Sequence, residues 1–399
     1  MMSREIGMFV DDVQEVQLGR EDYTFTVRFC DAMCGVFLNE EARQSEANAL
    51  LSEYFNVHIS KLFGQGGWWN DGGVFVQCGP HKCNVFAVLF NEYKWEMCAS
   101  KAAPGEQSIG YFIKMVHESK YARERSACPA LLLTIAGPNL GVSAAVHGAG
   151  PCVDPVVPLL PTLVLKQDRR MMTSLARALK ACKLCIGRLA DFYSALSNST
   201  PSSNEAQQLL YPYSRSFLFE GHEVPFAYDG QVGNKLVFAA HVTTGSGCLT
   251  TDLTIIVKFT ATYCVEAHNL CYECDKSAPR LYSHSVLPGG WHMVVMEYLT
   301  GADFKPQRES DIVQNKLTQV VKCLNQAGLV HGDLRGNNVC VIGDRVCLLD
   351  FDWSGRAGAE SYPGFMNHAN IDWSDGASDG LPLQTAHDQH MLAKLVRSD

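Results

Sequence analysis

The sequence has no long hydrophobic run. A helix that spans a bilayer needs about 20 consecutive apolar residues, whereas the densest apolar stretch, residues 156–165, is interrupted by Pro158 and Pro161. The N-terminal residues, MMSREIGMFVDD, also contain no apolar segment like that of a secretory signal peptide. We therefore expect no membrane span, and an intracellular location in the cytoplasm or the nucleus.

An excess of basic residues is also absent. The chain has 33 Lys and Arg against 42 Asp and Glu, which gives a formal net charge of −9. This balance argues against a protein that coats nucleic acid with its whole surface, but it is compatible with a local basic patch. With 47% hydrophobic and 19% charged residues, the chain is neither disordered nor fibrous. Its 399 residues predict two or three domains.

Cysteine is abundant, but no export signal accompanies it. The 16 cysteines are spread over a long chain, so we expect buried thiols and not a disulfide framework. Two CxxC pairs, Cys182/Cys185 and Cys271/Cys274, and the segment CGPHKC at residues 78–83 have spacings that could hold zinc. Structural thiols are the favoured interpretation, because both pairs lie in helical patterns and the third segment is typical of a turn between strands.

The apolar pattern divides the chain at residues 197–211, where SNSTPSSN is small, polar and typical of a linker. Residues 1–44 give little signal. Residues 45–196 predict an α/β domain, and residues 212–399 predict an α+β domain. In the first of these domains we expect helices over residues 41–55, 106–122 and 166–196 and strands over residues 74–77, 84–90, 130–136 and 141–146.

The predicted helix at residues 166–196 is both amphipathic and basic. Apolar residues recur from Met172 to Leu189 at steps of three and four, which indicates one buried stripe. We favour a solvated face on a connecting helix over a phosphate-binding helix. The basic residues concerned are Lys166, Arg169, Arg170, Arg177, Lys180, Lys183 and Arg188, against the single acid Asp168.

The C-terminal half contains the most informative pattern, HGDLRGNN at residues 331–338 and LLDFD at residues 348–352. Phosphoryl transfer needs one carboxylate that orients or deprotonates a hydroxyl, and a second carboxylate and an amide oxygen that hold Mg²⁺. Asp333, Asn338 and Asp350 supply these groups. Apolar flanks predict a hairpin, with strands over residues 339–342 and 346–349, that brings the three side chains to one end.

These two segments resemble the catalytic loop and the metal-binding motif of the protein kinase superfamily. The resemblance implies ATP and Mg²⁺ as cofactors, with Asp333 as the base and Asn338 and Asp350 as the metal ligands. It also extends upstream and downstream in the right order. It implies Lys258, in TIIVKF, as the lysine that contacts the ATP phosphates, with Glu266, or alternatively Glu273, as its ion-pair partner. Glu297 and Leu299, in VVMEYL, correspond to hinge residues at the adenine. His331 and Asp388 correspond to structural residues of the catalytic loop.

Several features depart from the kinase pattern. No GxGxxG loop precedes Lys258, and YDGQVG at residues 228–233 is a loose substitute. Asp352 stands where the metal motif has glycine, and Gly332 replaces the usual arginine. The sequence continues for eleven residues after Asp388, so we expect a truncated C-lobe. These departures leave a pseudokinase that binds nucleotide or nothing as the alternative.

The N-terminal half contains a second candidate site. Asp71 begins one predicted strand, and Glu92-Tyr-Lys94 ends a nearby one, so two carboxylates could hold Mg²⁺ while the lysine polarises the attacking water. This arrangement resembles the PD-(D/E)xK core of restriction-endonuclease-like nucleases, with Gln107 and Glu96 in supporting roles. The alternative is an exposed strand pair of little energetic value.

The combination of the two halves adds a further resemblance. An ExK strand, then CPALLLTIAGPNLGVSAAV at residues 128–146, then a kinase-like half resembles fungal and oomycete proteins related to the Crinkler effectors. In those proteins a nuclease-like domain is coupled to a kinase-like domain. The resemblance implies an intracellular effector, with protein substrates and with nucleic acid as a partner of the N-terminal domain.

We therefore expect a restriction-endonuclease-like α/β domain followed by a protein-kinase-like α+β domain. The predicted function is ATP- and Mg²⁺-dependent phosphoryl transfer to protein hydroxyls. The alternatives are a metal-dependent DNA nuclease with a regulatory pseudokinase half, and a non-catalytic binding scaffold.

Overall fold

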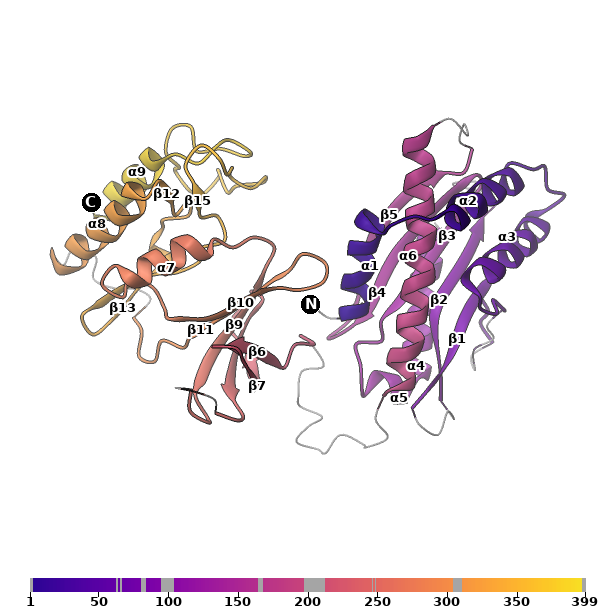
Figure 1. The fold of residues 1–399 in the computed structure, drawn as a ribbon, viewed down its shortest axis with the longest axis horizontal. Coiled ribbons are helices and arrows are strands. Elements are labelled where there is room, and N and C mark those ends of the chain that lie inside the picture. Colours follow the sequence, from indigo (N-terminus) through magenta and orange to yellow (C-terminus); the bar gives the residue numbers. More distant parts are fainter. Residues whose placement is uncertain are drawn as a thin grey trace. The chain divides into compact units, whose positions relative to one another are not determined.

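The computed structural model describes residues 3–61, 64, 67–79, 84–94, 104–163, 168–196, 212–245, 247, 249–303 and 311–396. The chain forms two compact units (Figure 1). The first unit is Met1–Ser214 with Pro288–Gly290, and the second is Arg215–Leu287 with Trp291–Asp399. Some sequence predictions fall outside the described residues, namely the linker at 197–211, positions 80–83 of the CGPHKC segment, Glu96 and Lys166.

The first unit is built on a five-stranded sheet in the order β1-β2-β3-β4-β5. Its strands β2 and β3 run parallel, and the other neighbours are antiparallel. A parallel pair needs a crossover connection, and α4 (Pro104–Glu118) and α5 (Lys120–Arg123) lie in it. The strands are β1 (Gly72–Cys78), β2 (Asn84–Lys94), β3 (Ala130–Ala136), β4 (Asn139–His147) and β5 (Pro151–Pro161).

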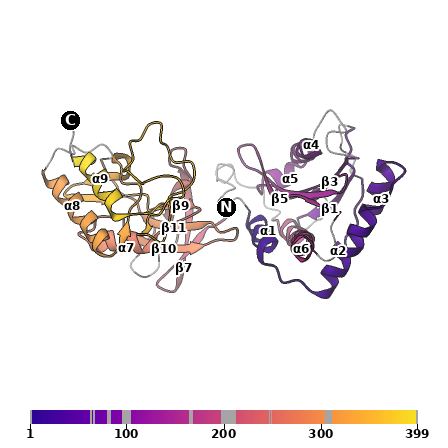
Figure 2. The same ribbon diagram turned by 90° about the horizontal axis from the view of Figure 1, so that it is seen from above.

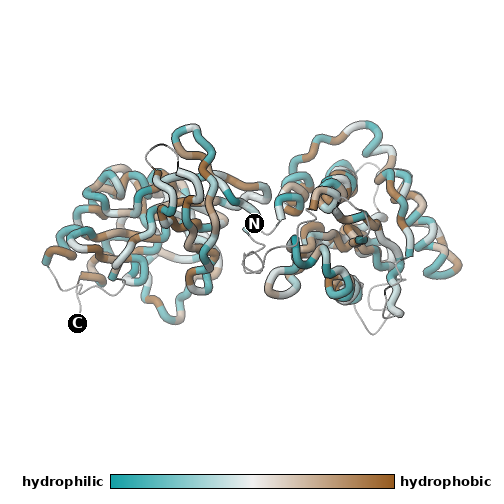
Figure 3. The backbone as a smooth tube through the Cα atoms, turned by 90° about the horizontal axis from the view of Figure 1, so that it is seen from below, coloured by the Kyte–Doolittle hydropathy of each residue, from teal (hydrophilic) through white to brown (hydrophobic). Residues whose placement is uncertain are grey.

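Helices cover both faces of this sheet. Figure 2 shows α4 on one face and α6 (Arg169–Ser194) on the other. This explains why β3, with the sequence ALLLTIA, is apolar almost throughout instead of alternating. Figure 3 shows apolar residues along the central strands and mixed polarity along the outer helices. Strand β5, which the sequence did not predict, lies at the sheet edge, where its prolines are tolerated.

Residues 1–44 are not a separate segment of unclear structure, as the sequence suggested. They contribute α1 (Arg4–Glu15) and α2 (Arg20–Met33), which both pack on α6 in the first unit, and α3 (Glu40–Phe55) starts within the same stretch. Helix α3 begins at the N-cap Asn39, whose side chain accepts a hydrogen bond of 2.8 Å from the Ala42 amide. The weak sequence signal reflects short helices whose apolar faces are completed only by packing on α6.

The basic face of α6 is directed at acids of α1 and α2. Lys180 pairs with Asp22 at 2.9 Å, and Arg188 pairs with Asp12 at 2.5 Å. Lys183 contacts Glu21 at 3.2 Å. These ion pairs support a structural role for the basic residues and not a phosphate-binding one. The predicted apolar stripe is buried, and both its Cys182 and the nearby Cys185 are free thiols of the core.

The second unit begins with a six-stranded antiparallel sheet in the order β10-β11-β9-β8-β7-β6. Helix α7 (Val265–Glu273) follows β9 and precedes β10. The strands are β6 (Ser216–Phe219), β7 (His222–Gln231), β8 (Val237–Val242), β9 (Thr254–Thr260), β10 (Leu281–Val286) and β11 (His292–Glu297).

The rest of the second unit combines the helices α8 (Asp311–Gln326) and α9 (Thr385–Val396) and several short strands with irregular segments, of which residues 357–384 are the longest. In its hydrophobic core, Leu317 and Leu324 of α8 belong to the same buried cluster as Phe351 and as Met391 of α9. The predicted hairpin is present as β13 (Val339–Ile342) and β14 (Arg345–Leu348). The remaining elements are β12 (Leu329–Val330), the 3-10 turn Gly336–Asn338 and β15 (Gly355–Arg356).

None of the helices in the described part of the chain is both long enough and apolar enough to cross a membrane.

Candidate functional site

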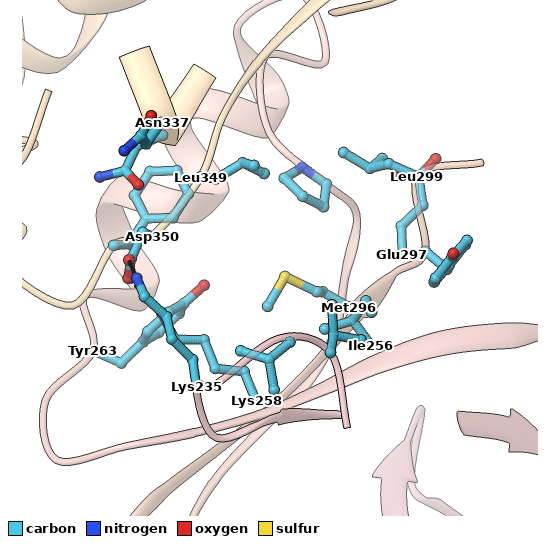
Figure 4. Close-up of a pocket in the computed structure, with 16 residues that line it drawn as sticks. Lys235, Ile256, Lys258, Tyr263, Met296, Glu297, Leu299, Asn337, Leu349 and Asp350 are labelled. Atoms are coloured by element: carbon cyan, nitrogen blue, oxygen red, sulfur yellow. Dashed lines mark hydrogen bonds and ion pairs between the residues drawn. The ribbon is translucent and has the colours of Figure 1, made fainter. Parts of the chain in front are cut away.

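A cavity of about 320 Å³ lies in the second unit, between the sheet and the β13–β14 hairpin (Figure 4). Its volume lies within the range of small-molecule sites. Apolar side chains line most of it, and a small group of polar side chains gathers at one end. The apolar residues include Val237, Ile256, Met296 and Leu349, and the polar residues include Lys258, Asn338 and Asp350.

Lys258 reaches this polar end from β9. Its side chain is only 9% exposed, and Nζ lies 2.5 Å from Oδ1 of Asp350 and 2.6 Å from Oδ1 of Asp352. Burial alone would raise the pKa of Asp350, but the ammonium groups of Lys258 and Lys235 outweigh burial and hold this pKa well below its usual range. Burial and the charge of Asp350 raise the pKa of Asp352 to about 6, against the opposing effect of Lys258. The glycine position of the metal motif therefore carries a second carboxylate of the site.

Two features of this cluster were not found from the sequence. Asp350 adopts a left-handed backbone conformation with φ 68°, which is rare for a residue other than glycine and concentrates at functional sites. Lys235, in the turn between β7 and β8, places Nζ 2.8 Å from Oδ2 of Asp350. The available signal was a Gly-Asn-Lys turn between two strand patterns, which by itself names no partner.

The catalytic-loop residues form one hydrogen-bonded group. Nδ2 of Asn338 donates to Oδ2 and to the backbone carbonyl of Asp333, each at 2.8 Å. The Arg335 guanidinium binds the Asp333 carboxylate through two bonds, of which the Nη2–Oδ2 bond is 2.7 Å. Since the nitrogen of the Asn338 amide is used by Asp333, its oxygen is the atom suited to a metal ion.

Asp388 lies where the sequence placed it, under the catalytic loop. Its carboxylate accepts hydrogen bonds from the backbone amides of His331, at 2.6 Å, and Gly332, at 3.1 Å. His331 in turn contacts the carbonyl of Leu349 at 3.1 Å, which links the loop to the metal-binding motif. Gly332 has φ 80°, and a Cβ there would lie 2.6 Å from the carbonyl oxygen of Trp353. An arginine therefore does not fit this backbone.

The expected ion pair between Lys258 and Glu266 is not formed. Glu266 lies in the first turn of α7 and pairs with Arg356 at 2.6 Å, both side chains being about half exposed. Glu273 is exposed at the other end of the helix. The prediction failed because Lys258 has two nearer carboxylates, Asp350 and Asp352.

Helix α7 presents a neutral ring toward the site instead. His268 stacks on Phe351 with ring centroids 4.7 Å apart, and burial lowers its pKa to about 4. Its Nδ1 lies 2.6 Å from the hydroxyl of Tyr263, a residue that lines the cavity. The sequence analysis overlooked both residues, because an aromatic residue and a histidine beside a short helix carry no distinctive spacing.

Glu297 and Leu299, the predicted hinge residues, both line the cavity. The Glu297 carboxylate is already bound, by Arg345 at 3.0 Å and by the Arg280 amide at 2.9 Å. Burial tends to raise the pKa of Glu297, but its bonds to Arg345 and Arg280 lower it overall. A polar contact of Glu297 with a ligand would therefore come from its backbone.

In the first unit, the structure brings Asp71, Glu92 and Lys94 together. The register that pairs Gly72 with Asn91 places Asp71 opposite Glu92, on the same face of the sheet. Lys94 Nζ lies 2.7 Å from Oε1 of Glu92, and Oδ2 of Asp71 accepts a 2.9 Å hydrogen bond from the backbone amide of Tyr93.

Burial dominates the electrostatics of this second cluster. Glu92 is 2% exposed, and burial, with a smaller contribution from the charge of Asp71, raises its pKa to about 7 despite Lys94. Burial also raises the pKa of Asp71. Among the described residues, Oε2 of Glu92 is buried without a hydrogen-bond partner, and so is Oε1 of Gln107 on α4. A buried carboxylate oxygen such as Oε2 of Glu92 is the ligand type that a divalent cation prefers.

Helix α3 contributes residues to this cluster that the sequence analysis missed. The side chains of Gln44 and Asn48 both donate to the carbonyl of Asp71. The charge of Glu40, one turn earlier, adds to the raised pKa values of Asp71 and Glu92. The spacing of 40, 44 and 48 on one helix face was the available signal. Within the described ranges, no group of three or more His, Cys, Asp or Glu side chains is arranged to hold a metal ion.

Comparison with known proteins gives a partial likeness. No protein-family model and no curated protein matches the chain. Among solved structures, the chain is similar to vaccinia-related kinase 3, with 12% identity and a TM-score of 0.34 over 47% of this chain and 67% of that chain. It is also similar to the kinase PK-1 of Cydia pomonella granulovirus, with 15% identity and a TM-score of 0.27 over 34% of this chain and 57% of that chain. The chain itself contains both helices and strands, and the likeness to vaccinia-related kinase 3 covers about half of its length. The nuclease and Crinkler resemblances stay predictions.

Proposed function

We propose that the second unit is an ATP- and Mg²⁺-dependent phosphotransferase that acts on hydroxyl groups of proteins. The observation that carries this proposal is the convergence of Lys258, Asn338 and Asp350 on one cavity, with Asp333 bonded directly to Asn338. These residues come from three separate segments of the chain. Their residue types are those that phosphoryl transfer requires.

The donor set fits a magnesium ion. The side-chain oxygens of Asn338 and Asp350 would hold the ion, since Mg²⁺ prefers oxygen ligands. When bound, it neutralises charge on the phosphates. Lys258 would contact the nucleotide phosphates, and the apolar side chains Val237 and Leu349 would enclose the adenine. Asp333 would orient the acceptor hydroxyl and take its proton, after Arg335 releases at least one of its oxygens.

Two measurements on one preparation test this proposal. Millimolar Mg-ATP should raise the melting temperature, because a ligand that binds only the folded state stabilises it. Transfer of the labelled γ-phosphate to generic protein acceptors should then be dependent on Mg²⁺. Adenosine with Mg²⁺ is the control for binding without phosphates. An unchanged melting curve with Mg-ATP would contradict the nucleotide site, and binding without transfer would leave a pseudokinase.

A second candidate function rests on the first unit. We infer that Asp71, Glu92 and Lys94 form a metal-dependent nuclease site, because Oε2 of Glu92 is buried, has no hydrogen-bond partner among the described residues, and lies beside a second carboxylate and a lysine. Asp71 and Glu92 would hold the cation, and Lys94 would polarise the attacking water. In this case the kinase-like unit is regulatory.

Plasmid nicking with Mg²⁺ or Mn²⁺ tests this second function. Lys94→Ala should stop nicking without preventing metal binding, while Lys120→Ala, which removes an exposed lysine of the same unit that pairs with Glu124, should leave it unchanged. Nicking that persists in Lys94→Ala would contradict the site. If neither unit turns over its substrate while nucleotide binding persists, a non-catalytic binding scaffold is the function that fits.

A further inference from the structure

The turn between β7 and β8 presents one long cationic side chain from a fixed backbone. The turn is closed by a 2.7 Å hydrogen bond from the Val232 amide to the Val237 carbonyl. The Gln231 side chain donates to the carbonyl of Lys235 at 2.8 Å. Gly233, with φ 65°, makes the tight reversal sterically accessible. The backbone of Lys235 is therefore held in place, while its side chain is 72% exposed and reaches toward the cavity.

Lys235 and Lys258 share the same carboxylate. Lys258 binds Oδ1 of Asp350 at 2.5 Å, and Lys235 binds Oδ2 at 2.8 Å. Lys258 also contacts Asp352. Two ammonium groups thus balance two carboxylates, and both oxygens of the carboxylate proposed to bind metal are occupied by protein cations. A divalent cation on Asp350 would repel the ammonium groups and would have to displace at least one of them.

Lys235 is the ammonium group that can leave most easily. Its side chain is 72% exposed against 9% for Lys258, so separating it from Asp350 returns it to solvent at small cost. The turn also stands where protein kinases have a glycine-rich loop over the phosphates. That loop binds phosphate through backbone amides, whereas this turn carries an ammonium group beside the lysine that contacts phosphate from β9.

We propose that Lys235 is a phosphate-binding residue that exchanges partners: it holds Asp350 when the site is empty of nucleotide, and it transfers to the β- and γ-phosphates when Mg-nucleotide binds. This inference rests on the proposed nucleotide site and adds a residue to it. The charge pattern explains how a turn without GxGxxG can bind a polyphosphate. It also makes Lys235 a competitor of free Mg²⁺ for Asp350.

Binding measurements on the full chain test the exchange. We expect Lys235→Ala to weaken Mg-ATP and Mg-ADP by about tenfold or more, the usual effect of losing one charge-assisted bond. Adenosine affinity should not change. Without nucleotide, Mn²⁺ followed by electron paramagnetic resonance should bind several-fold more tightly to Lys235→Ala, because its competitor is gone. Lys235→Arg should keep most of the nucleotide affinity.

Lys316→Ala is the matched control, because Lys316 forms a similar 2.9 Å pair with Asp275 outside the cavity. It should change none of these affinities. Equal Mg-ATP affinity in Lys235→Ala and wild type would overturn the inference, and so would an equal loss of adenosine affinity or unchanged Mn²⁺ binding. Because the readout is binding, a protein that binds Mg-ATP without transferring phosphate contradicts the proposed activity but not this role. A wild-type protein that does not bind Mg-ATP overturns both.

Discussion

The carboxylate of Asp388 accepts a 2.6 Å hydrogen bond from the backbone amide of His331, although the two residues are 57 positions apart in the chain. A second bond, 3.1 Å long, comes from Gly332. Asp388 is 1% exposed, so these amides have no water as an alternative acceptor. The backbone of the HGDLRGNN segment is therefore held by a side chain of α9.

The first prediction concerns this brace. Asp388→Ala should lower the free energy of unfolding by about 2–4 kcal/mol, because it leaves two buried amides without an acceptor. Hydrogen exchange over residues 329–335 should accelerate at the same time. Asp375→Ala, at an exposed position of the same unit, is the control and should change neither quantity. Unaltered exchange in Asp388→Ala would show that the loop does not depend on this carboxylate.

The second prediction separates chemistry from nucleotide binding. Asp333→Asn should abolish phosphoryl transfer and keep Mg-ATP affinity within about threefold, since the residue orients the hydroxyl but does not contact the phosphates. Lys258→Met, in contrast, should lose both phosphoryl transfer and Mg-ATP affinity. The measurements are γ-phosphate transfer and nucleotide titration on the same preparations. Equal transfer by Asp333→Asn and wild type would remove Asp333 from its proposed role.

The third prediction follows from the raised pKa of Glu92. The pKa of Glu92 is about 7 in the folded protein, whereas the ordinary pKa of a glutamate is 4.5. Between pH 4.5 and about pH 7 the folded state therefore binds more protons than the unfolded state. Stability should therefore fall as pH rises through this window, by at most about 3 kcal/mol. Glu92→Gln should flatten this slope. Mg²⁺ should offset the loss at pH 8 more than at pH 5, because it favours the ionised carboxylate.

Urea unfolding at a series of pH values measures this effect as a difference between variants. Glu106→Gln, which changes an exposed carboxyl group of α4, is the matched control and should retain the wild-type slope. If wild type and Glu92→Gln show the same dependence on pH, the buried carboxyl group is not protonated in the folded state.

The fourth prediction tests the structural interpretation of the basic helix. Lys180→Ala should destabilise the protein by about 1–2 kcal/mol, because it leaves the largely buried Asp22 without its cation. Burial alone would raise the pKa of Asp22, and its bonds to Gly19, Lys180 and Tyr54 lower it. Arg169→Ala, at an exposed position, should have little effect. Lost DNA affinity in Lys180→Ala without lost stability would favour the phosphate-binding alternative.

The candidate residues of the HGDLRGNN segment could be predicted from the sequence, because they are separated by only a few positions in the chain. Asp333 and Asn338 lie five positions apart, and the intervening turn and the following hairpin carry them to one place. The hairpin itself was predicted to within one residue at its end. The lysine strand β9 was also found, because TIIVKF resembles the kinase strand that carries the phosphate-binding lysine.

The partners of these residues were less accessible. Glu266 was predicted as the ion-pair partner of Lys258 from its place in the helix. In the structure, Lys258 forms its ion pairs with Asp350 and Asp352 instead. Lys235 lies 115 positions from Asp350, and no local pattern links them. Ion pairs depend on distances of a few ångströms between side chains from separate elements, which sequence spacing does not report.

The sequence by itself determined which residue types could perform chemistry in each half of the chain, and most of the strongly periodic helices and strands that carry them. The tertiary structure alone decided which charges meet. It buried Glu92 with no partner for Oε2 in the described part of the chain, it placed two lysines on Asp350, and it directed basic residues of α6 to acids of α1 and α2. The reason is physical: periodicity reports local backbone geometry, whereas burial and pairing depend on how distant elements pack and exclude water.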